Sequence, residues 1–159
     1  MSRATAPLPF LSLACEAARR MGAVGVLILA EGPMDWDVVR VLGSNEVTIL
    51  VASASQRQLE VIRESGLVAI EVEPTEVAIS ERISLALIEA VANDRLQAGA
   101  RVVVVYSGFE AEALDSLSVI RLGEHLERLT ARDLRALETS VPFETLKAVV
   151  DVAIEIGRE

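Results

Sequence analysis

Aromatic side chains are scarce in this 159-residue chain, at 3% of the sequence, although 52% of its residues are hydrophobic. A core built from it must be aliphatic, which is typical of buried parallel strands and closely packed helices. Cysteine and histidine occur once each, as Cys15 and His125. A single cysteine excludes an intrachain disulfide, so a reducing, cytoplasmic location is expected. Neither residue has partners at metal-ligand spacing, and a zinc site needs about four ligands, so no metal or other cofactor is expected in this chain.

Long hydrophobic runs and clusters of positive charge are also missing. The longest apolar stretch, residues 23–30, is far shorter than the roughly 20 residues that span a bilayer. No signal peptide precedes it. The net charge is −9, from 15 Lys and Arg against 24 Asp and Glu. Such a surface repels nucleic acids and anionic membranes, so neither is expected as a partner.

Apolar segments of strand length alternate with helical patterns along most of the chain. Strands are expected over 24–30, 47–51, 67–72 and 101–106. Helices are expected over 9–21, 34–42, 56–64 and 75–96. Because these strands are apolar throughout rather than at alternate positions, both faces of their sheet must be covered. The sequence therefore predicts a three-layer, Rossmann-like α/β sandwich with parallel strands.

The end of the chain departs from this alternation. A further strand, 117–122, follows the fourth after only about ten residues, whereas a parallel crossover needs about a dozen or more, so we predict an antiparallel edge strand. The sheet then has about five strands, four of them parallel. Two helices are expected beyond it, over 131–138 and 142–159. This division predicts an α/β domain over 8–123 and a helical segment over 124–159.

Residues 23–122 resemble the C-terminal α/β domain of pyruvate kinase. The matching segments are a strand (47–51), the start of the helix after it (55–59), and a later strand with its loop (99–108). The final strand of the pyruvate kinase domain is also an antiparallel edge. The resemblance implies a doubly wound sheet with strand order 3-2-1-4-5.

The C-terminal segment carries a second pattern. Residues 142–159 begin with Pro142-Phe143-Glu144 and end with Gly157-Arg158-Glu159. This segment is similar to the first helix of the diadenylate cyclase domain, which runs into a Gly-Arg-Glu-Gly element. A pyruvate-kinase-like domain before a cyclase domain is the architecture of the archaeal-type diadenylate cyclases and their bacterial relatives (the DisA_N/DAC family). The resemblance implies a parent enzyme that makes cyclic di-AMP from two ATP molecules, with a divalent metal.

The catalytic motifs of that family are missing from this sequence. No Asp-Gly-Ala or Arg-His-Arg motif occurs, and these would bind ATP and ligate the metal in the cyclase domain. No Gly-x-Gly-x-x-Gly or Walker A motif occurs either. We therefore expect the chain to be the N-terminal part of a longer protein, truncated at the first helix of the cyclase domain, with no catalytic residue of its own.

Ligands bind α/β sheets at the carboxyl ends of the parallel strands. The corresponding loops here are 31–33, 52–55, 73–75 and 107–109. Related loops of allosteric pyruvate kinases hold a sugar phosphate with hydroxyl groups and helix N-terminal amides, which makes ligand-binding candidates of Ser53, Ser55, Ser107 and Gly108. Two observations oppose a phosphate site. The carboxylates of Glu31 and Asp35 would repel it, and either of the first two serines has the ordinary explanation of a helix cap.

The expected function is a non-catalytic regulatory or oligomerisation domain of a diadenylate cyclase. The cyclase joins two ATP molecules from two facing active sites, so a domain that brings subunits together would control how often those sites meet. Pairing of strand 117–120 with its copy predicts a homo-oligomer, and the apolar face of the last helix is expected to pack on the downstream cyclase domain. The alternative is a sensor domain for a small phosphorylated metabolite.

Overall fold

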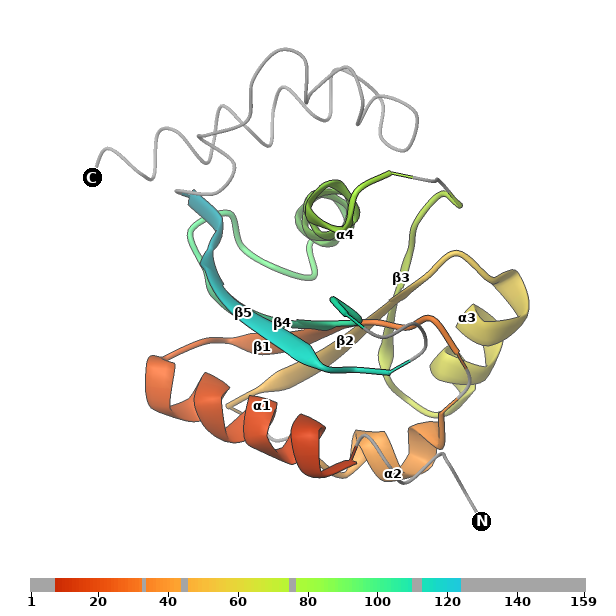
Figure 1. The fold of residues 1–159 in the computed structure, drawn as a ribbon, viewed down its shortest axis with the longest axis horizontal. Helices are drawn as coiled ribbons and strands as arrows, with labels where there is room; N and C mark the ends of the chain where they lie inside the picture. The colour runs from red at the N-terminus through yellow and green to blue at the C-terminus, as the bar shows by residue number, and fades with distance from the viewer. Residues whose placement is uncertain (1–7, 33, 44–45, 75–76, 110–112, 124–159) are drawn as a thin grey trace.

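The computed structural model describes residues 8–32, 34–43, 46–74, 77–109 and 113–123. These residues form a five-stranded sheet with helices on both of its faces (Figure 1). In chain order the elements are α1 (Leu8–Met21), β1 (Gly25–Leu29), α2 (Trp36–Arg40), β2 (Thr48–Ser53), α3 (Gln56–Glu64), β3 (Val68–Glu71), α4 (Ile79–Ala92), β4 (Arg101–Tyr106) and β5 (Ser116–Arg121).

The strand order is β3-β2-β1-β4-β5. The first four strands of this order are parallel, and β5 runs antiparallel to β4 over their whole length, from Arg101 opposite Arg121 to Tyr106 opposite Ser116. The predicted α/β class, the strand order and the antiparallel edge are all confirmed. The short connection before β5 left no length for a crossover helix, so the chain could only turn back.

The central strands are buried on both faces, which explains their continuous apolar sequences. All five residues of β1 are buried. Their side chains alternate across the sheet. Val26 and Ile28 lie in the core that α1 covers, whereas Leu27 and Leu29 lie in the core that α4 covers.

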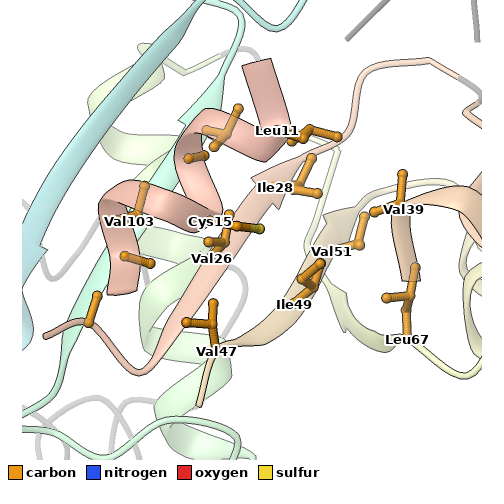
Figure 2. Packing of buried hydrophobic residues seen from close by; sticks show 14 of the residues in the cluster. Leu11, Cys15, Val26, Ile28, Val39, Val47, Ile49, Val51, Leu67 and Val103 are labelled. Atoms are coloured by element: carbon orange, nitrogen blue, oxygen red, sulfur yellow. The ribbon is translucent and has the colours of Figure 1, made fainter. Parts of the chain in front are cut away.

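Figure 2 shows the face of the sheet that α1 covers. Leu11 and Cys15 of α1 pack over Val26 and Ile28 of β1 and Val103 of β4. Small and aliphatic residues recur on this side of the helix at helical spacing, so α1 can approach the sheet closely. Apart from Trp36 and Cys15, the buried residues of this core are aliphatic, in line with the shortage of aromatic residues in the sequence.

Cys15 is buried, which is typical of a cysteine that packs in a core. Burial raises the pKa of its thiol, and the charge of Arg19 offsets part of this effect. Trp36 is also buried in the same core. Gly22 ends α1 with a φ of 68°, the left-handed conformation expected of a glycine C-cap.

Helix boundaries differ most from the sequence-based expectations. Helix α4 begins at Ile79 and ends at Ala92, whereas the apolar spacing predicted 75–96. Asn93 caps its end, and Asp94 takes a φ of 58°, so the chain leaves the helix there and Leu96 packs back as a core residue outside it. Helix α2 is also shorter than predicted, because Asp35 accepts a hydrogen bond from the Val38 N–H and starts the helix late.

The two C-terminal helices predicted over 131–138 and 142–159, together with His125, lie outside the described residues. The division of the chain at residues 123 and 124 stays a prediction for the same reason. Among the helices that the structure describes, none has the length and hydrophobicity to cross a membrane.

Candidate functional site

A cavity of about 260 Å³ lies at the carboxyl ends of β1, β2 and β3. This is the edge of an α/β sheet at which ligands bind. One wall comes from α4. The lining residues are Leu29, Ala30, Glu31, Ala52, Ser53, Ala54, Val72, Glu73, Pro74, Arg82 and Leu85. Three of the four loops named from the sequence therefore contribute to one cavity.

An ion pair joins two sides of this cavity. Nη1 of Arg82 lies 2.8 Å from Oε1 of Glu31, so α4 is tied to the loop after β1. Both side chains are partly exposed, and an ion pair of this kind contributes at most about 1 kcal/mol to stability. Its larger consequence is electrostatic, because the charges of Arg82 and Glu31 largely offset each other inside the cavity.

Ser53 is the predicted site residue that lines the cavity. Its buried hydroxyl donates a hydrogen bond to Oε1 of Gln58 at 2.6 Å and accepts one from the Ser55 N–H at 3.1 Å. Nε2 of Gln58 in turn donates to the carbonyl oxygen of Gly32 at 2.8 Å. These bonds hold the loop after β1 against the start of α3.

Ser55 has the role of a helix cap. Its hydroxyl accepts a hydrogen bond from the Gln58 N–H at 3.2 Å, and its backbone is extended, as at an ordinary N-cap. The alternative explanation given for these serines, that they cap a helix, is therefore confirmed for Ser55. Ser55 is not among the residues that line the cavity.

Ser107 and Gly108 follow β4 and are likewise not among the lining residues of the cavity. The hydroxyl of Ser107 is buried and has no hydrogen-bond partner within the described ranges. The Gly108 N–H donates to Oδ1 of Asp115 at 2.8 Å, and the Phe109 N–H donates to Oδ2 at 3.1 Å. A Cβ at Gly108 would lie 2.5 Å from Oγ of Ser116, so a larger residue here would have to move that side chain. A ligand-binding role for the four predicted residues stays a prediction.

Carboxylates outnumber cations around the cavity. Glu31 and Glu73 line it together with a single guanidinium, that of Arg82. Glu89 on α4 reports the charge on this side of the cavity. Burial raises the pKa of its carboxyl, a hydrogen bond from Asn93 lowers it, and the charges of Glu71 and Glu73 raise it further. The side of the cavity nearest β3 is therefore negative.

Sequence reasoning named the loop that contains Glu73 but missed Arg82. Arg82 lies inside a helix and meets Glu31 across 51 positions of sequence, so no local motif marks it. Within the part of the chain that the structure describes, no three His, Cys, Asp or Glu side chains are placed to hold a metal ion.

Comparison with known families adds one finding. A family model described as "Probable sensor domain DacZ_P" matches residues 8–130, which include every helix and strand that the structure describes. No curated protein matches the chain.

Proposed function

The chain belongs to the DacZ_P family, a probable sensor domain linked to a diadenylate cyclase, and on this premise we propose that it senses a small molecule. It is the non-catalytic regulatory domain of a protein that makes cyclic di-AMP. The observation that carries this proposal is the cavity at the ends of β1, β2 and β3, which combines aliphatic walls with charged side chains.

The construction of the cavity suits a sensor. Its walls come from three strand ends and from α4, and these parts are held together by the Arg82–Glu31 ion pair and by the hydrogen bonds of Ser53 and Gln58. A ligand in the cavity contacts parts of the chain that are distant in sequence, so it can favour one relative position of α4 over another. A ligand can regulate a protein only if it binds one of two arrangements of that protein more tightly than the other.

The regulated step is the meeting of two active sites. In the cyclase family that residues 142–159 resemble, two ATP molecules are joined, with a divalent metal, across two facing active sites. A sensor domain that associates with its copy sets how often these sites face each other. Strand β5 is the last strand of the described sheet, and Val119 on it is 40% exposed, so we propose β5 as the strand that pairs in a homo-oligomer.

A cavity-filling variant tests the proposal. Ala54 lines the cavity from an exposed loop position, so Ala54→Leu reduces the space without disturbing the core. In the longer protein that carries this domain, the variant should remove the response of cyclic di-AMP synthesis to a small-molecule extract. Val41→Phe adds a similar bulk at an exposed position outside the lining, and it should keep the response.

A deletion provides the second test. If the longer protein makes cyclic di-AMP at the same rate and with the same response after removal of residues 1–122, this domain has no regulatory role. An unchanged response in Ala54→Leu would instead place the sensing site elsewhere.

A further inference from the structure

The charged groups in the cavity limit the chemistry of its ligand. Glu31 and Glu73 carry two negative charges, and Arg82 carries one positive charge, so the lining is negative by one charge. The guanidinium of Arg82 already donates to Glu31 at 2.8 Å. A phosphate would have to displace Glu31 or lie beside it, and it would be repelled in either position.

Three hydrogen-bond donors that a phosphate could use are also engaged. Phosphate sites at helix N-termini use hydroxyl groups and free backbone amides. Here the Ser53 hydroxyl donates to Gln58, and the Ser55 N–H donates to Ser53. The Gln58 N–H donates to the Ser55 hydroxyl. These three donors at the start of α3 are therefore engaged within the chain.

The side of the cavity nearest β3 favours a positive group. Glu73 lines it, and the carboxylate of Glu71 lies close enough that both add to the negative potential at Glu89. An ammonium group placed against Glu73 would relieve this repulsion. Glu31, the other carboxylate of the lining, can stay paired with Arg82 when such a group binds.

The volume of the cavity bears on the size of the group that it holds. Its volume of about 260 Å³ lies below the roughly 300–1,000 Å³ of pockets that enclose drug-sized molecules. The space therefore suits a small metabolite better than a dinucleotide.

We infer that the cavity binds a small metabolite through an ammonium group, which Glu73 holds, and not through a phosphate. This inference deepens the proposed function and rests on it. The ammonium group has two possible sources: a simple amine, or an amino acid whose carboxylate lies against the remaining N–H groups of Arg82.

Thermal melts of the purified chain with five probes test the inference: putrescine, L-alanine, L-lysine, glucose 6-phosphate and inorganic phosphate. We expect at least one of the three amines to raise the melting temperature and neither phosphate to do so. Glu73→Gln should weaken binding of that amine by about tenfold or more, because a charge-assisted hydrogen bond is lost. Glu64→Gln removes an exposed carboxylate on α3 outside the lining, and it should leave the affinity unchanged.

Arg82→Gln separates the two sources of the ammonium group. It releases Glu31 from its ion pair, so a simple amine such as putrescine should bind more tightly. An amino acid should bind about tenfold more weakly, because its carboxylate loses the guanidinium. Either result supports the inference, provided that Glu73→Gln weakens the same probe.

Two results would overturn the inference. One is a phosphate that binds and loses its affinity in Arg82→Gln. The other is the absence of a shift with all three amines. The proposed function would survive both, because it is tested separately by the response of cyclic di-AMP synthesis in Ala54→Leu.

Discussion

Gly25 opens β1 at the centre of the sheet, where it lies opposite Thr48 of β2 and Val102 of β4. A Cβ at this position would lie 2.8 Å from the carbonyl oxygen of Thr48 and 3.0 Å from Cδ1 of Leu50. The first of these atoms belongs to the backbone of a neighbouring strand. Rotation of a side chain cannot relieve that contact, so Gly25→Ala must move β1 and β2 apart.

The size of the effect follows from these contacts. Overpacking of a well-packed core costs about 1–3 kcal/mol. Replacing glycine also reduces the entropy of the unfolded chain, which offsets about 0.4–1 kcal/mol. We therefore expect Gly25→Ala to lower the free energy of unfolding by about 1–2 kcal/mol. For a urea m value of about 2 kcal/mol/M, typical of a small domain, the unfolding midpoint falls by about 0.5–1 M.

Urea unfolding followed by circular dichroism measures this change, and Gly32→Ala is the matched control. A Cβ at Gly32 has no heavy atom of the described residues within 4 Å, so the control should unfold at the wild-type midpoint or slightly above it. A wild-type midpoint for Gly25→Ala, or an equal loss in both variants, would refute the reasoning from close approach.

Three further changes probe the site and the core. Glu89→Gln should raise the free energy of unfolding at pH 7 by less than about 1 kcal/mol, because burial raises the pKa of Glu89 and so penalises its charged form. This gain should fade as the pH falls through the raised pKa towards 4.5. Equal gains in urea unfolding at pH 7 and pH 4 would contradict it. Ser53→Ala should lower the free energy of unfolding in a thermal melt by about 1–2 kcal/mol, because the buried hydroxyl bonds Gln58 at 2.6 Å; an unchanged melt would show that this bond adds nothing. Cys15 should react with iodoacetamide far more slowly in the folded chain than in urea, because its thiol is buried and its pKa is raised; similar rates in mass spectrometry would contradict that burial.

Strands were the most predictable part of the fold. The valines of segment 101–106 face both sides of the sheet, and such a continuous apolar run is typical of a strand that is buried on both faces. Helix ends were less predictable, because they depend on local competition for backbone groups. The apolar spacing of α4 continues to Leu96, yet the backbone leaves the helix at Asn93 and Asp94. The Asn93 side chain donates to the carbonyl oxygen of Glu89 and so competes with the helix for a backbone acceptor.

The position of the site was predictable, whereas its chemistry was not. Topology alone places the ends of parallel strands at one edge of the sheet, so Ser53 and the loops after β1 and β3 were expected near one another. Hydroxyl groups beside a helix N-terminus indicate a phosphate only if their donors are free. In the fold, the Ser53 hydroxyl and the Ser55 N–H donate within the start of α3. The cation among the described lining residues, Arg82, lies on a helix 51 positions away from its partner Glu31. The excess of carboxylates over cations among the lining residues therefore favours a positively charged ligand group over a phosphate.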